Sequence, residues 1–242
     1  MCFVDKGAGD VKNIRHIWEV LYGLITLKDL KNNEEIKSLF EVADRQLAAL
    51  GYTEHSFRHV GLVAKEAGEI LETLGFPERE VELAKIAGYL HDIGNAVNRI
   101  DHAHSGAILA YGILTKMGMG YSEAAEIMMA IGNHDENSGA PVSNISAALI
   151  LADKSDVHRT RVRNNDIATF DIHDRVNYAV DSSELYVDNE KKVVVLELHI
   201  DTEICPVMDY FEIFLVRMTM NRRAAEFLGL KFQLIINGTH LL

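Results

Sequence analysis

The chain has 242 residues, of which 48% are hydrophobic, enough for one sizeable core or for a main domain with a smaller appendage. Acidic side chains outnumber basic ones by 36 to 24, and the net charge of −12 disfavours nucleic acid as a partner. Charges interrupt every apolar stretch before it reaches the length of a membrane span, and the distant Cys2 and Cys205 fit a reducing interior, so we expect a cytoplasmic protein without membrane contact.

The helical hydrophobic period dominates the first two thirds of the chain. Asn33 and Ser122 are candidate N-caps of two helices, and Ser143 or Asn144 opens another. The predicted helices cover residues 34–50, 60–74, 78–90, 102–117, 123–134 and 145–157. These elements predict a mainly α domain, which we place at residues 1–170.

The rest of the chain has the pattern of strands around one helix. Its first half is rich in β-branched or alternating residues and is interrupted by the turn-like pair Asp188-Asn189, which indicates a hairpin. The predicted order is a strand at 176–187, a strand at 191–201, a helix at 206–230 and a strand at 231–238. We therefore expect a small α+β subdomain of ββαβ order at residues 171–242.

Several helices place a metal-capable side chain in line with the apolar residues that face the core. They are His59, His91, His134 and Asp153, and Asp92 follows His91 directly. Unpaired polar groups that point inward each cost on the order of 1 to 3 kcal/mol, so several of them together favour a shared ion over isolated burial. A buried polar network without metal is the alternative. Imidazole and carboxylate ligands without thiolates fit Mn²⁺, Fe or Zn²⁺ best, with Mg²⁺ or Ni²⁺ as further options, and one or two ions.

The order of these residues resembles the pattern H…HD…H…D of the HD-domain superfamily of metal-dependent phosphohydrolases. The resemblance covers roughly residues 50 to 165 and is carried by the segments TEHSFRHVGLVAKEAG, HDIGN, AIGNHDEN and LADKSDV. It implies an all-helical bundle with the metals between its helices. It also implies a metal-activated water that attacks phosphorus, with Asp92 as the ligand shared by two ions.

The resemblance also assigns ligands to each ion. One ion is implied near His59, His91, Asp92 and Asp153, and a second near Asp92, His102 and His134. His102 is chosen because the family's additional histidine precedes a glycine by four positions, and Gly106 fits that relation; His104 is the fallback. His55 is expected beside the site or on the substrate side, whereas His104 and Asp101 are read as partners of the ligands or, preferably, as solvated residues.

The substrate is less well determined by the sequence. Asn95 stands where many relatives carry a lysine that positions phosphate. Arg58, Arg99 and Lys154 are candidates for binding a small phosphorylated substrate because each neighbours a proposed ligand, and Lys154 joins Asp92 as a candidate catalytic residue. The run of Arg159, Arg161 and Arg163 is instead read as a solvated helix end.

These observations favour a metal-dependent phosphohydrolase that acts on a nucleotide or another small phosphoester. The alternatives are a di-iron oxygenase, which the same ligands would serve, and a non-catalytic ligand-sensing module of the same fold. The C-terminal subdomain could cap the cleft, bind an effector or pair subunits. We favour a homodimer formed through it.

Overall fold

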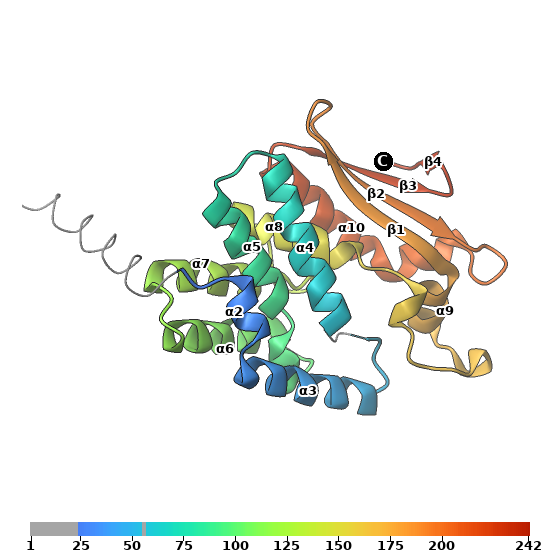
Figure 1. Ribbon diagram of the computed structural model, residues 1–242. Helices are drawn as coiled ribbons and strands as arrows, with labels where there is room; N and C mark the ends of the chain where they lie inside the picture. The colour runs from blue at the N-terminus through green and yellow to red at the C-terminus, as the bar shows by residue number, and fades with distance from the viewer. Residues whose placement is uncertain (1–23, 55–56) are drawn as a thin grey trace, which may run out of the picture.

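The computed structural model describes residues 24–54 and 57–242 and shows a helical bundle with a small sheet on one side (Figure 1). Cys2 lies outside the described part. The bundle consists of α2 (Leu27–Lys31), α3 (Glu34–Ala49), α4 (Phe57–Thr73), α5 (Glu78–Leu90), α6 (His102–Lys116), α7 (Tyr121–Gly132) and α8 (Asn144–Ser155). A short 3₁₀ turn, η1 (Ile93–Ala96), lies between α5 and α6, and two more, η2 (Arg159–Arg161) and η3 (Ile167–Thr169), follow α8. Within the described residues, no helix has the length and apolar character needed to cross a bilayer.

Side-chain caps set two of the predicted helix starts. The Asn33 side chain accepts hydrogen bonds from the amides of Glu35 and Ile36, and α3 begins there as predicted. Ser143 accepts from the Ser146 amide and is the N-cap of α8, which decides between the two candidates. The prediction for Ser122 is wrong. The backbone is already extended at Gly120, whose carbonyl accepts from the Ala124 amide at 3.0 Å, so α7 starts before the serine.

The C-terminal region has the predicted ββαβ order, with additions at both ends. Its elements are α9 (Ile172–Ala179), β1 (Val180–Asp188), β2 (Val193–Ile200), α10 (Val207–Phe227), β3 (Lys231–Ile236) and β4 (Thr239–His240). The strands lie in the order β1-β2-β3-β4; β2 and β3 are parallel and the other pairs antiparallel.

Local backbone chemistry explains both additions. The Asp171 side chain accepts from the Asp174 amide and starts α9, so the β-branched residues before Val180 are helical and the first strand begins later than predicted. At the other end, Asn237 and Gly238 both have positive φ, 51° and 74°, which is the backbone of a two-residue hairpin turn and folds β4 back onto β3.

The bundle and the sheet share one hydrophobic core. Helix α10 packs against α8 on one side and against β2 and β3 on the other, and β1 contacts α4 and α8. One cluster of buried apolar side chains runs from Leu149 in α8 through Phe214 in α10 to Leu196 in β2. Figure 1 shows α10 between the bundle and the sheet, so the C-terminal region reaches the interior face of the bundle. The division at residue 170 stays a prediction.

Candidate metal centre

Five different helices bring the predicted ligands to one place. His59 lies in the first turn of α4, His102 begins α6, and Asp153 lies in the last turns of α8. His91 is the C-cap of α5, and His134 follows the C-cap of α7, so both lie at helix ends, as predicted from the sequence. The four histidines and Asp92 are at most 4% exposed, and the Asp153 side chain is 12% exposed. The ligands therefore meet in the interior, where polar groups need partners.

Four side chains form a first group with the spacing of ligands around one ion. Nε2 of His59 lies 3.2 Å from Nε2 of His91, and Oδ1 of Asp153 lies 3.4 and 3.5 Å from these two atoms. Oδ2 of Asp92 lies 3.6 and 3.5 Å from the same nitrogens. Ligands at about 2.1 Å from one cation stand about 3.0–3.5 Å from each other, so these atoms could hold a single ion.

A second group shares Asp92 with the first. Oδ1 of Asp92 lies 3.4 Å from Nε2 of His102, which in turn lies 3.2 Å from Nε2 of His134. The carboxylate of Asp92 thus turns one oxygen toward each group, as a bridging ligand would. Asn95 is fully buried and donates its amide to Oδ1 of Asp92 at 2.8 Å, so Asn95 fixes this carboxylate.

Two glycines bring His102 close to Asp92. A Cβ atom at Gly94 would lie 2.0 Å from the carbonyl oxygen of His102 and 2.5 Å from the amide nitrogen of Gly106. A Cβ atom at Gly106 would lie 3.1 Å from the nitrogen of Gly94. The η1 turn and α6 therefore touch through their backbones, which only residues without side chains allow. This contact gives a physical reason for the histidine–glycine relation that selected His102.

The far side of each imidazole identifies which nitrogen carries the proton. Nδ1 of His91, His102 and His134 faces the carbonyl oxygen of Gly88, Arg99 and Ile131, at 2.8, 3.1 and 2.6 Å. Nδ1 of His59 faces Oδ2 of Asp156 at 2.7 Å. Because carbonyl and carboxylate oxygens only accept, each Nδ1 donates, and each ring in its neutral, metal-binding form turns the lone pair of Nε2 toward the shared interior. Converging lone pairs and carboxylates fit a cation, so this donor set suits a divalent metal ion.

The pKa shifts within the cluster also favour the binding of a cation. Burial lowers the pKa of His91, but the charges of Asp92 and Asp153 outweigh it and raise the pKa to about 10. Burial also lowers the pKa of His134 to well below its usual value. The pKa of Asp153, which burial raises, is brought well below its usual value by Lys154 and His91. The site thus attracts positive charge to the position between the carboxylates.

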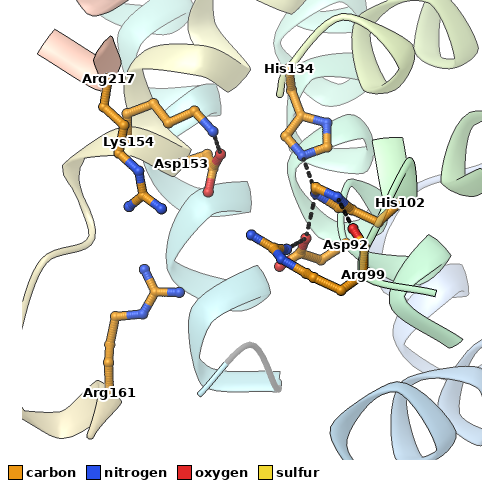
Figure 2. A pocket seen from close by; sticks show the side chains of 8 residues that line it. All are labelled: Asp92, Arg99, His102, His134, Asp153, Lys154, Arg161 and Arg217. Carbon is orange, nitrogen blue, oxygen red and sulfur yellow. Dashed lines mark hydrogen bonds and ion pairs between the residues drawn. The ribbon is translucent and has the colours of Figure 1, made fainter. Parts of the chain in front are cut away.

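Four cationic side chains line a small cavity together with several of the predicted metal ligands. Figure 2 shows Arg99, Lys154, Arg161 and Arg217 around the space between Asp153 and the pair of His102 and His134. The cavity measures about 10 Å³, roughly what one water-sized sphere requires. Arg99 and Lys154 were predicted from the sequence to bind phosphate, and both line this cavity. Arg161 and Arg217 also line the cavity, but they were not predicted from the sequence to bind phosphate.

Lys154 is held by two carboxylates. Its Nζ atom lies 2.8 Å from Oδ2 of Asp153 and 2.5 Å from Oε2 of Glu136, and the side chain is 5% exposed. Oε1 of Glu136 accepts from Nε of Arg217 at 3.0 Å. Burial raises the pKa of Glu136, but Lys154 and Arg217 bring it far below its usual value. A chain of ion pairs therefore joins Asp153 in α8 to Arg217 in α10.

Arg58 lies elsewhere than predicted. Its guanidinium binds Oε2 of Glu54 at 2.9 Å and Oδ2 of Asp156 at 3.0 Å, and it is not among the residues that line the cavity. The same oxygen of Asp156 accepts from His59, so Arg58 supports a ligand from behind. His55 lies outside the described residues. His104 has a side chain 55% exposed and lies 3.7 Å from Asp101, which agrees with a solvated helix start.

Four residues of the site were missed or misread from the sequence. Asp156 lies three positions after Asp153, a helical spacing that could have shown it. Arg161 is 3% exposed and not part of a solvated helix end, because the chain folds back over Glu54 after α8. Arg217 interrupts the apolar run LVRMTM, which was a usable signal. Glu136 offered no signal beyond its closeness to His134.

The family profile agrees with the residue pattern. The sequence profile of the HD domain matches residues 52–161. An uncharacterised protein of Methanocaldococcus jannaschii is 28% identical over 216 residues, which cover 79% of this chain and 80% of that protein. Ribonuclease Y of Mycoplasma mycoides is 32% identical over 148 residues, 61% of this chain but only 33% of the relative. A crystal structure of a predicted HD superfamily hydrolase from an uncultured Thermotogales bacterium aligns with 27% identity and a TM-score of 0.42, over 59% of this chain and 74% of that one.

Proposed function

We propose, from the membership of residues 52–161 in the HD domain family, that this protein is a metal-dependent phosphohydrolase. Its substrate would be a phosphoester of a nucleotide or of another small molecule. The observation that carries the proposal is the convergence of four Nε2 lone pairs with the carboxylates of Asp92 and Asp153 beside a wall of cations. The nitrogen lone pairs can coordinate a metal ion, and the four cationic side chains that line the cavity can bind a negatively charged phosphate.

The residues that would hold the metal fall into the two groups described above. His59, His91, Asp92 and Asp153 would hold one ion, and Asp92, His102 and His134 a second. A bound divalent cation activates water at neutral pH and neutralises the oxygens of a phosphate. Mn²⁺, Fe and Zn²⁺ suit these nitrogen and oxygen ligands best.

The protein's own groups fix the ligands and receive the substrate. Asn95 holds Asp92 in its shared position, and Asp156 keeps the proton of His59 on Nδ1. Arg99 lies 3.7 Å from Oδ1 of Asp92 and on the cavity wall, where it can meet a phosphate oxygen that approaches the second group. Lys154 also lines the cavity, and its charge partly offsets the carboxylate of Asp153, so a phosphate meets less repulsion there.

A substrate screen tests this function. Purified protein is offered phosphate monoesters, nucleotides, phosphate diesters and a short RNA, each with Mn²⁺, Fe²⁺, Co²⁺, Ni²⁺ or Mg²⁺. RNA is included because several relatives are ribonuclease Y. We expect turnover of a small phosphoester with at least one ion and its loss in Asp92→Ala, while His104→Ala, an exposed histidine of the same helix as His102, stays active. The proposal is wrong if no phosphoester reacts, or if Asp92→Ala keeps full activity.

We also propose a partner, a cellular compartment and an oligomeric state for the protein. The partner is a small phosphorylated substrate rather than nucleic acid, the compartment is the cytoplasm, and two copies pair through the C-terminal subdomain. Strand β1 forms one edge of the sheet, which leaves backbone groups available for such pairing. Light scattering of the full chain at several concentrations tests the dimer.

A further inference from the structure

Two arginines from separate parts of the chain reach the cavity from the side away from His102 and His134. Arg161 belongs to η2, which follows the last helix of the bundle, and Arg217 belongs to α10 of the C-terminal region. Figure 2 shows their guanidinium groups directed toward each other, beside Asp153 and Lys154. Two like charges therefore lie close together at one side of the cavity.

Arg161 is fixed by backbone carbonyl groups. Its Nη1 donates to the carbonyl oxygen of Asp156 at 2.6 Å, and Nε and Nη2 donate to that of Glu54 at 3.2 Å. These three hydrogen bonds leave one N–H on each η nitrogen, because a guanidinium carries five donors. The residue is 3% exposed. Burial above all lowers its pKa, and the charge of Arg217 acts in the same direction.

Arg217 is fixed at its base and open at its tip. Its Nε atom donates to Glu136 at 3.0 Å, and its Cζ atom lies 4.6 Å from the centre of the Phe214 ring, which it covers. Its two η nitrogens have no hydrogen-bond partner among the residues that the structure describes. The side chain is 20% exposed, so an arriving anion can reach it.

The like charges of Arg161 and Arg217 are therefore held in place with donors to spare. Two guanidinium groups in an interior environment repel each other unless an anion lies between them. Glu136 pairs with both Arg217 and Lys154, and Lys154 pairs in addition with Asp153, while Arg161 lies 3.8 Å from Asp156. Asp153 is a proposed metal ligand, so a bound ion would share its negative charge and would add positive charge nearby. With the ions of the proposed function bound, the site suits an anion that carries more than one negative charge.

We infer that Arg161 and Arg217 form a clamp for the non-bridging oxygens of a terminal phosphate group, and that α10 is thus part of the substrate site. A terminal phosphate has three such oxygens and up to two charges, whereas an internal diester has two oxygens and one charge. Paired guanidinium groups bind the former better. This inference rests on the proposed function and narrows its substrate class to phosphate monoesters and nucleotides with a terminal phosphate.

Binding of inorganic phosphate tests the clamp without any turnover. Orthophosphate is titrated calorimetrically into the Mn²⁺-loaded full chain, and Arg217→Gln is compared with Arg222→Gln, an exposed arginine of the same helix. We expect Arg217→Gln to weaken phosphate binding at least about tenfold, as the loss of a charged hydrogen bond does, and Arg222→Gln to leave it unchanged. Arg217→Lys should recover part of the affinity, because it restores the charge but not the two-pronged geometry.

Arg161→Lys tests the other arginine of the clamp. Thermal unfolding checks that Arg217→Gln and Arg161→Lys are both folded. In turnover assays, Arg217→Gln should raise KM for para-nitrophenyl phosphate more than it lowers kcat, and should affect bis(para-nitrophenyl) phosphate less. Equal phosphate affinity in wild type and in both folded variants overturns the clamp, even if the protein is an active hydrolase. Phosphate binding that depends on Arg217, without turnover of any ester, supports the clamp and refutes the hydrolase.

Discussion

Nδ1 of His59 lies 2.7 Å from Oδ2 of Asp156, a buried carboxylate that also pairs with Arg58. Burial raises the pKa of Asp156, but Arg161 and His59 bring it far below its usual range, so the group stays charged and keeps the proton on Nδ1. The replacement Asp156→Asn offers a weaker acceptor. We expect it to lower the affinity for Mn²⁺ about 10- to 100-fold, as the loss of such supporting partners does.

Equilibrium dialysis with metal analysis measures this effect. The control is Asp166→Asn, at an exposed carboxylate that caps η3 and contacts none of the proposed ligands in the described structure. Its affinity should match that of the wild type. An unchanged affinity in Asp156→Asn would show that the tautomer of His59 does not depend on this contact.

Metal binding should release protons. With a pKa raised to about 10 by the charges of Asp92 and Asp153 against the effect of burial, His91 is protonated in the metal-free protein at pH 7.5. A cation ligand must give up that proton. We expect the first Mn²⁺ to release about one proton, measured by calorimetry in buffers of different ionisation enthalpy. His91→Ala should remove this release together with most of the affinity, whereas His104→Ala should retain both.

A buried glutamate should make stability depend on pH. Burial raises the pKa of Glu66 to about 7, although Ser155 donates a hydrogen bond to it at 2.8 Å. The folded protein thus holds a proton that the unfolded chain loses near pH 4.5. Between pH 4.5 and about 7 the free energy of unfolding therefore falls as pH rises, and above pH 7 the full cost of the buried charge remains.

The variant Glu66→Gln removes this cost. We expect it to raise the free energy of unfolding at pH 8 by about 1 to 3 kcal/mol and to change it little at pH 4.5. Urea unfolding at four pH values measures the difference. Glu69→Gln, at an exposed position of the same helix, should show no such dependence on pH. If Glu66→Gln raises the free energy of unfolding by the same amount at all pH values, the ionisation of buried Glu66 is not the cause.

The backbone contact between Gly94 and α6 should tolerate no side chain. Gly94→Ala places a Cβ atom 2.0 Å from the carbonyl oxygen of His102, so η1 and α6 must separate. We expect a loss of about 1 to 3 kcal/mol in stability or more, and weaker binding of a second ion because His102 moves away from Asp92. Gly112→Ala, within α6 and with nothing within 4 Å, should instead stabilise by up to about 1 kcal/mol. Chemical denaturation and metal stoichiometry measure both variants.

Local periodicity predicted the helices and four inward-facing candidate ligands, whereas His102 came from the resemblance to the HD-domain superfamily. His59 and Asp153 follow the apolar faces of long helices, and burial selects the same faces in the structure. The predicted strand before Val180 is wrong because the Asp171 cap outweighs the β propensity of the residues that follow. Arg217 and Glu136 meet only through tertiary packing of α10 on the bundle, which no local pattern contains.

The contact of Gly94 with Gly106 has a consequence for which ions the site accepts. Peptide atoms, not side chains, set the separation of η1 from α6, and with it the distance from Asp92 to His102. Side-chain rotamers can adjust to a larger or smaller ion, but a main-chain spacing cannot. In the proposed two-ion site, the main chain would therefore set the separation of η1 from α6, and the side chains of Asp92 and His102 would take up a change of ionic radius.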